Sequence, residues 1–183
     1  NISFISLEQR NEEPFFYISD KIERYVLYPR LNRTIYHIVG IIHKIIKLKK
    51  EKGIDVIIDI DGILDMYSIP CKWLTGVKVI SWEHFNYFQN PFVPYRKITR
   101  RMAARWADWI VTLTAEDKQY YQEHLKIKNN IKNIYNPIVQ DGKIHGYCNE
   151  SKLLLSVGRL TYQKGFDMLV DIAKPILDKN SDW

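Results

Sequence analysis

The sequence predicts an α/β fold with a mostly parallel sheet, and two observations support this prediction. Short apolar segments with the character of strands alternate with longer segments whose apolar residues recur at helical spacing. Residues 55–60 also form a nearly continuous apolar run flanked by acids, which is typical of a strand covered on both faces of a parallel sheet. Alternation of this kind joins parallel strands through helical crossovers.

The chain opens with two predicted strands and its clearest helix. Residues 2–7 form an apolar run typical of a buried strand, and residues 15–18 form a short second one. Residues 32–52 carry apolar side chains at helical spacing, with Lys and Glu crowded into the last turn. Gly53 follows this pattern and is expected to end the helix.

The centre of the chain continues the alternation of strands and helices. The strand at 55–60 is followed by residues 64–74, which favour a helix broken at Pro70. A Thr-Gly turn then leads into a further predicted strand at residues 77–82.

Two more helices and two more strands complete this part of the chain. Residues 94–106 favour a helix that carries five basic residues, and residues 109–113 favour a strand. Thr114 is expected to cap a helix over residues 115–125, because its hydroxyl can accept a hydrogen bond from a free amide of the first turn. The last strand of this group is predicted at residues 131–135.

Composition along the chain predicts two domains, the first over residues 1–140. Residues 141–151 hold glycine and polar residues with little apolar content, so we interpret them as a linker. Residues 152–183 then supply one strand, at 153–157, and one helix, at 166–177. Because a lone strand and helix cannot bury their apolar faces, we expect the start of a truncated second domain and a chain that is a piece of a longer protein.

Composition and charge exclude several classes of protein. With 46% hydrophobic and 26% charged residues, the 183-residue chain resembles a soluble globular protein rather than a disordered, collagen-like or coiled-coil one. Cys71 and Cys148 are too few for a disulfide scaffold and lack metal-site spacing, which favours a reducing compartment. The sequence shows neither a signal peptide nor a membrane-spanning run. The net charge of +6 favours acidic partners such as a nucleotide, a nucleic acid or an anionic membrane.

The second predicted domain contains the clearest candidate binding site in the sequence. Gly158 and Arg159 directly follow the strand at 153–157, and Lys164 comes shortly before the next helix. Ligands of open α/β sheets collect at the carboxyl ends of the strands. Glycine lets the backbone approach a ligand closely, and Arg and Lys hold phosphate oxygens, so these residues predict a diphosphate site that needs no metal. The alternative is that both cations are solvated surface residues.

These residues resemble the signature that opens the second domain of family 4 glycosyltransferases, which have the GT-B fold. The chain has V-G-R-L at residues 157–160 and K-G-F-D at residues 164–167. Further segments resemble family segments in the same order, at residues 2–7, 55–58, 81–86, 108–114 and 134–138. The resemblance implies that residues 1–140 are an incomplete, acceptor-side Rossmann-like domain, and that residues 152–183 hold the first βα unit of a Rossmann-like donor-nucleotide domain.

The resemblance is closest to members that build capsule, exopolysaccharide or lipid-linked oligosaccharide. It implies a hexosyltransferase-type reaction that moves a sugar from a nucleotide-diphosphate donor to a saccharide or lipid-linked acceptor, with retention at the anomeric carbon. By this analogy Arg159 and Lys164, with Gly158, bind the donor diphosphate and stabilise the charge of the leaving group. Neither a metal nor another cofactor is expected. Asp59 and Asp61 come closest to an Asp-x-Asp metal motif, and a structural or turn role is favoured for them.

His84 is the candidate catalytic residue of the first domain. It lies in a segment that resembles the family's acceptor-side loop, which implies that its imidazole contacts the donor sugar or handles the acceptor proton. The alternative is a buried histidine with satisfied hydrogen bonds. Glu83 and Asn86 are candidates for contact with acceptor or sugar hydroxyls, with capping of the loop as the alternative for Glu83. The neighbouring aromatic residues Trp82, Phe85, Tyr87 and Phe88 belong either to the core or to a sugar-stacking surface.

The basic residues of the 94–106 segment leave two interpretations. They face an anionic membrane, as suits a protein that acts on lipid-linked acceptors, or they form a solvated face. The second interpretation is favoured, because Met102, Ala103 and Trp106 indicate that the other side of the helix packs inward. We therefore expect a cytoplasmic protein, with peripheral contact at the inner face of the cell membrane as the alternative.

Three other functions are alternatives to the transferase. A nucleic-acid-binding domain is disfavoured, because the cations are scattered and form no binding motif. A non-catalytic GT-B-like interaction module has no need of Arg159 and Lys164, and a GT-B sugar-nucleotide epimerase would keep the architecture but change the reaction. The family's glycine-rich loop and paired glutamates have no counterpart in these 183 residues, so we expect the chain to be inactive alone.

Overall fold

The computed structural model describes residues 2–9, 14, 17–31, 34–89, 95–128, 130–137, 150 and 152–180. The chain forms two compact units, Asn1–Pro137 and Ile138–Trp183, and each is treated by itself below. The predicted linker at 141–151 lies outside the described residues except for Glu150, as does Cys148. The proposed domain limits at 140 and 152 therefore stay predictions.

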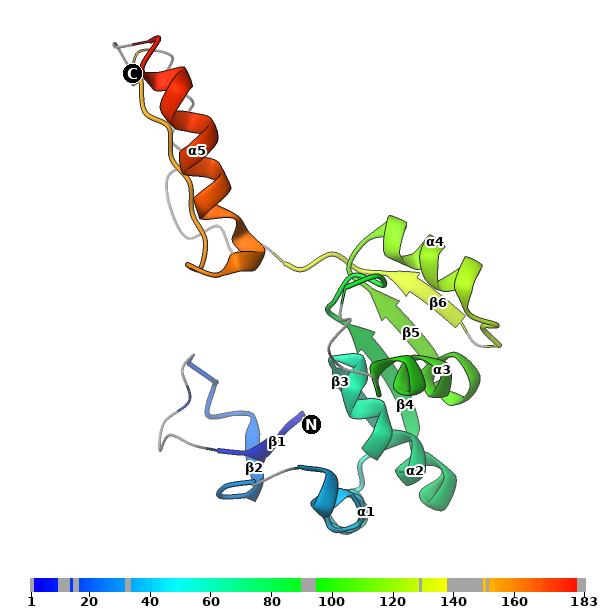
Figure 1. The fold of residues 1–183 in the computed structure, drawn as a ribbon. Helices are drawn as coiled ribbons and strands as arrows, with labels where there is room; N and C mark the ends of the chain where they lie inside the picture. The colour runs from blue at the N-terminus through cyan, green and yellow to red at the C-terminus, as the bar shows by residue number, and fades with distance from the viewer. Residues whose placement is uncertain are drawn as a thin grey trace. The chain divides into compact units, whose positions relative to one another are not determined.

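The first unit contains two parallel sheets (Figure 1), which confirms the predicted α/β class. In one of them β1 (Ser3–Glu8) pairs with β2 (Glu23–Tyr28). The other has the order β3-β4-β5-β6, formed by Val56–Ile60, Lys78–Glu83, Trp109–Thr112 and Asn130–Asn133. Each strand of the second sheet therefore lies beside the next one in the sequence, so that their carboxyl ends share one edge.

Helices connect these strands. They are η1 (Thr34–His37), α1 (Ile38–Lys52), η2 (Gly62–Leu64), α2 (Asp65–Thr75), α3 (Arg96–Trp106) and α4 (Ala115–His124). Two predicted helix signals are confirmed in atomic detail. The amide of Gly53 bonds to the carbonyl of Lys49 at the end of α1, and the Thr114 hydroxyl accepts a hydrogen bond of 3.0 Å from the amide of Asp117.

The core lies on one face of the larger sheet. Val79 and Ile110 have no exposed surface and belong to a buried cluster that includes Ile69 of α2, Ala103 of α3 and Tyr121 of α4. The opposite face carries the alternate residues Ile58, Ile60 and Trp109, which are 52%, 54% and 42% exposed. Helices α2, α3 and α4 therefore cover this face of the sheet. Ser81 and Glu83 of β4 lie on the same face, because alternate residues of a strand share a face.

The predicted break at Pro70 is wrong, because α2 runs without interruption from Asp65 to Thr75. Pro70 lacks the N–H that would bond to the carbonyl of Met66, which normally disfavours a proline inside a helix. Ile69 and Cys71 on either side are fully buried, so packing of the helix against the core compensates for the lost hydrogen bond.

The early strand was predicted in the wrong place. Residues 15 and 16 of the predicted 15–18 strand lie outside the described residues, and residues 17 and 18 are not in a strand. The neighbour of β1 is instead β2, over Glu23–Tyr28. Only Leu27 of β2 is buried, so charged and aromatic residues on its exposed side obscure the alternation that marks a strand.

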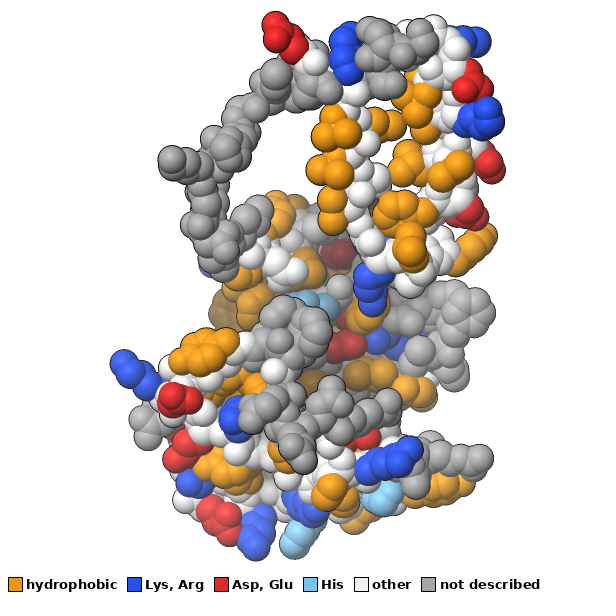
Figure 2. All heavy atoms as spheres, turned by 90° about the vertical axis from the view of Figure 1, so that its left-hand side faces the viewer, with side chains coloured by type: hydrophobic (Ala, Val, Ile, Leu, Met, Phe, Trp, Pro, Cys, Tyr) orange, Lys and Arg blue, Asp and Glu red, His pale blue; other side chains and the backbone are white. Residues whose placement is uncertain are grey.

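The second unit contains η3 (Tyr162–Lys164) and α5 (Phe166–Leu177). The predicted helix is confirmed, but residues 153–157 are extended without being a strand. A strand is defined by backbone hydrogen bonds to a neighbouring strand, and the described part of this unit contains no neighbouring strand with which residues 153–157 could pair. Figure 2 shows apolar side chains gathered along this extended segment and α5. Among the described residues, no helix is long and apolar enough to cross a membrane.

Candidate functional site

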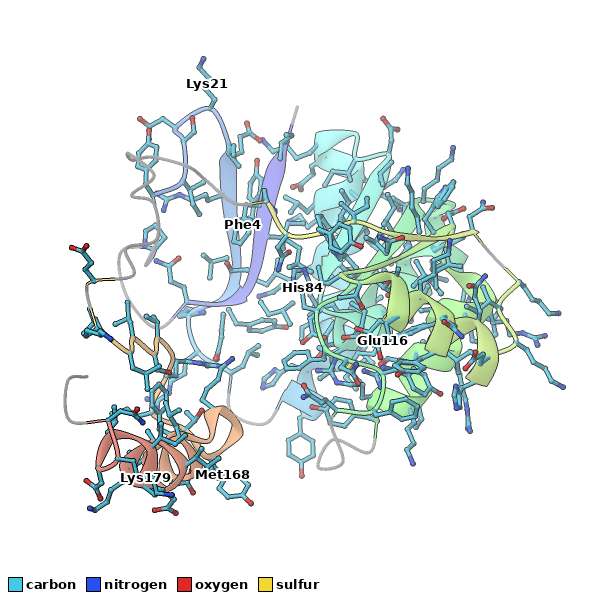
Figure 3. The ribbon with its side chains drawn as sticks, turned by 90° about the horizontal axis from the view of Figure 1, so that it is seen from above. Phe4, Lys21, His84, Glu116, Met168 and Lys179 are labelled. Atoms are coloured by element: carbon cyan, nitrogen blue, oxygen red, sulfur yellow. The ribbon has the colours of Figure 1, made fainter. Side chains whose placement is uncertain are left out.

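Three of the predicted site residues lie together where β4 ends. Glu83 is the last residue of β4, and His84 and Asn86 follow it in the loop that leads toward α3. Ligands of parallel sheets bind at this edge, outside the carboxyl ends of the strands. In the view of Figure 3, His84 lies between Phe4 of β1 and Glu116 of α4.

The Glu83 carboxylate is buried and fully engaged by protein donors. Its Oε1 accepts hydrogen bonds from Arg96 Nη1 at 2.9 Å and from the amide of Phe85 at 3.2 Å. Its Oε2 accepts from Arg100 Nε at 3.0 Å and from the Tyr121 hydroxyl at 2.9 Å. These contacts correspond to the alternative in which Glu83 caps the loop, while its contact with a sugar hydroxyl stays a prediction.

Arg96 joins the ends of two neighbouring strands. Its guanidinium contacts both Glu83 and Asp61, and its Nη1 and Nη2 lie 2.5 and 3.2 Å from the two Asp61 carboxylate oxygens. Asp61 follows β3 and has a φ of 103°, which costs a residue other than glycine about 1–3 kcal/mol. Burial by itself would lower the pKa of Arg96, but its hydrogen bond to Asp61 and the charge of Glu83 raise it, so the guanidinium remains charged.

Gly62 allows these groups to approach closely. A Cβ atom at this position would lie 3.0 Å from Oε2 of Glu83 and 3.4 Å from Oδ2 of Asp65. The lack of a side chain at residue 62 therefore lets the turn after β3 and the end of β4 pack closely without displacing these carboxylates.

The two acids of the Asp-x-Asp segment point to different environments. Asp59 is buried and accepts a hydrogen bond from Ser68, whereas Asp61 is paired with Arg96 at the sheet edge. Burial raises the pKa of Asp59 to about 6. Burial and the charge of Asp59 raise the pKa of Asp65, which accepts a hydrogen bond from Ser81 at 2.6 Å. The contact of Asp59 with Ser68 and the ion pair of Asp61 with Arg96 fit the structural role favoured for both acids, while a metal role at this segment stays the untested alternative.

Unsatisfied polar atoms gather around the same strand end. Within the described part of the chain, four buried side-chain atoms have no hydrogen-bond partner, namely Asp65 Oδ1, Trp82 Nε1, His84 Nε2 and Arg96 Nε. Trp82 and His84 lie on β4 or directly after it, with ring centroids 5.6 Å apart, while Asp65 and Arg96 bond to residues of β4. Trp82, whose ring lies beside His84, alternates to the side of β4 opposite Ser81 and Glu83, so the four atoms belong to two faces of the sheet. Because buried polar groups in proteins are normally satisfied, the ring nitrogens of Trp82 and His84 mark a place where a bound polar molecule can supply partners.

The loop itself has a defined internal structure. The Asn86 side chain accepts a hydrogen bond of 3.0 Å from the amide of Phe88, so its amide group shapes the loop. The aromatic residues divide between core and surface: Tyr87 packs against the buried core, while Phe88 is 60% exposed. Phe85 is partly exposed beneath the Arg96 guanidinium, whose central carbon lies 4.6 Å from the ring centroid.

The predicted diphosphate residues are brought together in the second unit. A Cβ atom on Gly158 would lie 3.1 Å from the Phe166 ring and 3.7 Å from Cγ of Lys164, so the extended segment passes close to the start of α5. The backbone between Arg159 and Lys164 turns through Thr161, whose amide bonds to the Arg159 carbonyl at 2.8 Å. Both cationic side chains are exposed.

The residues that surround Glu83 were missed by the sequence interpretation. Arg96 and Arg100 were grouped with the solvated cations of the basic segment, although they lie one helical turn apart and in line with Ala103 and Ala104. That spacing was the available signal. It separates a buried pair of arginines from the exposed Lys97, Arg101 and Arg105 on the same helix.

Comparisons with known proteins agree with this architecture. The family model described as Glycosyltransferase Family 4 matches residues 2–141. A curated relative, an uncharacterized glycosyltransferase of Haemophilus influenzae (strain ATCC 51907 / DSM 11121 / KW20 / Rd), is 34% identical over 189 residues. The alignment covers 100% of this chain and 51% of the relative, so the chain spans about half the length of that protein.

A solved structure is similar in fold. It is the apo form of the lipopolysaccharide outer core galactosyltransferase WaaB, with a TM-score of 0.50 and 19% sequence identity. The similarity covers 65% of this chain and 32% of the other. At this identity the likeness concerns the fold, which is the predicted Rossmann-like arrangement of a GT-B glycosyltransferase.

Proposed function

The chain belongs to glycosyltransferase family 4, and on this premise we propose that the full-length protein moves a hexose from a nucleotide-diphosphate donor to an acceptor, with retention at the anomeric carbon. The acceptor in this proposal is a saccharide or a lipid-linked saccharide. The observation that carries the proposal for this chain is the buried Nε2 of His84 where β4 ends, which has no hydrogen-bond partner among the described residues.

His84 is the proposed catalytic residue. Its Nε2 is buried and has no partner among the described residues, so the imidazole can bond to a sugar hydroxyl or accept the acceptor's proton. Asn86 lies two residues further on, at the position proposed for contact with sugar or acceptor hydroxyls. Glu83 supports both by holding the start of the loop.

Gly158, Arg159 and Lys164 are the proposed donor-diphosphate site. The two exposed cations flank the turn before α5, and the closely packed glycine leaves the backbone accessible. A departing nucleoside diphosphate gains negative charge in the transition state, and fixed cations stabilise that charge. In this proposal they do the work that a divalent metal does in other transferases, so neither a metal nor another cofactor takes part.

The proposed pathway is surface polysaccharide biosynthesis in the cytoplasm, with peripheral contact at the inner face of the membrane as the alternative. The exposed side chains of Lys97, Arg101 and Arg105 fit the favoured interpretation, in which the basic outer face of α3 is solvated. The alternative of contact with anionic lipid is separate from the transfer reaction and is tested by binding to vesicles with and without anionic lipid.

The test of the proposed function uses the full-length protein with a panel of nucleotide sugars and a membrane extract as acceptor. Release of nucleoside diphosphate from one donor, lost when both Arg159 and Lys164 are replaced by Ala, supports the transferase. Conversion of the donor to an isomeric nucleotide sugar identifies an epimerase instead. A folded protein that releases nothing from any donor contradicts the proposal and favours an interaction module.

A further inference from the structure

Helix α3 buries two of its five cations. Arg96 and Arg100 are 4% and 6% exposed, while Lys97, Arg101 and Arg105 on the same helix are exposed. A buried guanidinium is costly unless it is paired and hydrogen-bonded. The partners of these two arginines therefore reveal what the buried side of the helix does.

Arg100 holds the loop that carries His84. Its Nε donates to Glu83 Oε2 at 3.0 Å, and its Nη2 donates to the carbonyl of Asn86 at 3.2 Å. Its Nη1 donates to the carbonyl of Tyr87. One guanidinium thus fixes the chain on both sides of His84, at the residue before it and at the second and third residues after it.

Helix α4 completes this attachment. Asp117 Oδ1 accepts a hydrogen bond of 2.9 Å from the amide of Tyr87, and the Tyr121 hydroxyl bonds to Glu83. The central carbon of the Arg100 guanidinium lies 5.2 Å from the Tyr87 ring centroid and 5.7 Å from that of Tyr121. The loop after β4 is therefore held from two helices, and Arg100 is the residue common to its charged, backbone and aromatic contacts.

We infer that Arg100 is a positioning residue for the proposed transfer, because it fixes residues 83–87 and so sets the place of the His84 imidazole. The inference rests on the proposed function of His84. Arginine is suited to this task, since its planar fork reaches a carboxylate and two carbonyls at once. The compact ammonium of lysine cannot reproduce that geometry.

The test compares Arg100→Lys and Arg100→Gln with Arg101→Gln in the full-length protein. Arg101 is the next residue of the same helix and is exposed, so it is a matched control. We expect Arg100→Gln to lower kcat by roughly 100-fold, as a displacement of about 1 Å in a catalytic group does, with little change in the KM for the donor. We expect Arg100→Lys to recover only a small part of the kcat lost in Arg100→Gln. Arg101→Gln is expected to retain the kcat of the wild type.

A double-mutant cycle with His84→Ala separates positioning from simple loss of stability. If Arg100 acts through His84, Arg100→Gln has no further effect on kcat once His84 is replaced. Full additivity of the two losses, or a kcat for Arg100→Gln equal to that of Arg101→Gln, overturns the inference.

Hydrogen exchange of the loop amides gives a second readout that needs neither activity nor the more disruptive Gln variant. In Arg100→Lys we expect faster exchange over residues 84–89, with unchanged exchange in α1. Unchanged exchange over 84–89 overturns the inference, whatever the enzyme does. Failure of the wild type to transfer any sugar overturns the proposed function instead, so the two failures are distinguishable.

Discussion

The hydroxyl of Tyr121 donates a hydrogen bond of 2.9 Å to Oε2 of Glu83, and so joins α4 to the end of β4 across 38 positions of the sequence. Tyr121 is 1% exposed, and burial together with the charge of Glu83 raises its pKa. The phenol therefore remains protonated and serves as a permanent donor to the buried carboxylate.

Replacing this phenol tests how much the contact stabilises the fold. Tyr121→Phe is expected to lower the free energy of unfolding by about 1–3 kcal/mol, because a buried hydrogen bond to a charged group is lost. Tyr120→Phe is the matched control, since the Tyr120 hydroxyl also bonds to a carboxylate, but on the surface, where it contacts Glu116. Urea denaturation of the two variants gives the comparison, and equal losses would contradict the prediction.

The buried carboxyls of Asp59 and Asp65 are expected to make stability depend on pH. An unfolded aspartate titrates near pH 4, whereas burial raises the pKa of folded Asp59 to about 6. Between these values the folded protein binds more protons than the unfolded chain, so the free energy of unfolding falls as pH rises through this window.

Asp59→Asn removes the proton uptake by this residue and retains an oxygen that can accept the hydrogen bond from Ser68. As the pH rises from 4 to 8, the free energy of unfolding should fall in both proteins. The fall should be smaller in the variant than in the wild type, by roughly 2–3 kcal/mol. Asp55→Asn, at an exposed position before the same strand, is the control and should follow the wild type. Melting curves across this range decide the matter, and parallel curves for Asp59→Asn and the wild type would refute the assignment.

Gly62→Ala is expected to disturb the site as well as the fold. The new Cβ would lie 3.0 Å from a Glu83 oxygen that is already held by Arg100 and Tyr121, so the oxygen can move only by giving up hydrogen bonds. We expect a loss of about 1–3 kcal/mol in stability and a lower rate of sugar transfer.

Gly53→Ala provides the comparison for Gly62→Ala. Nothing lies within 4 Å of a Cβ at residue 53, but its φ of 63° makes alanine unfavourable by about 1–2 kcal/mol. The two variants should therefore have similar stability and differ in transfer rate. A normal rate for Gly62→Ala would show that Glu83 tolerates displacement.

Lys164→Gln tests the donor site directly. If Lys164 contacts the diphosphate, the variant should bind the nucleotide sugar roughly ten times more weakly, because one charge-assisted hydrogen bond is lost. Lys174→Gln on α5 is the control, since the exposed Lys174 pairs only with the surface carboxylate of Asp178, 3.0 Å away, among the described residues. Calorimetric titration of the full-length protein measures both, and equal affinities would remove Lys164 from the proposed site.

The fold could be predicted from the sequence because its signals are local. The apolar run of β3, the amphipathic pattern of α1 and the cap at Thr114 each depend on residues within one element. The prediction failed where tertiary packing decides the outcome. Burial of α2 keeps it intact through Pro70, and the 153–157 segment lacks a described neighbour with which to form a strand.

The candidate site could be predicted only in part for the same reason. The segment after β4 drew attention to His84 through its family resemblance, but the ion pairs of Glu83 join residues 13 and 17 positions apart across different elements. A basic helix ordinarily presents its cations to water, and the residue types alone do not distinguish Arg100 from Arg101. Only their spacing relative to Ala103 and Ala104 separates the two arginines in the sequence, and the folded chain shows that Arg100 is the buried one.

The sharing of one carboxylate by two arginines limits how this site can evolve. Glu83 balances Arg96 and Arg100 together, while Asp61 supplies the second negative charge. A single replacement of any member strands an unpaired charge inside the protein, which is far more harmful than exchanging the whole group for apolar residues. Related proteins that differ at one of these four positions are therefore expected to differ at several of them together, so that substitutions at these positions are correlated.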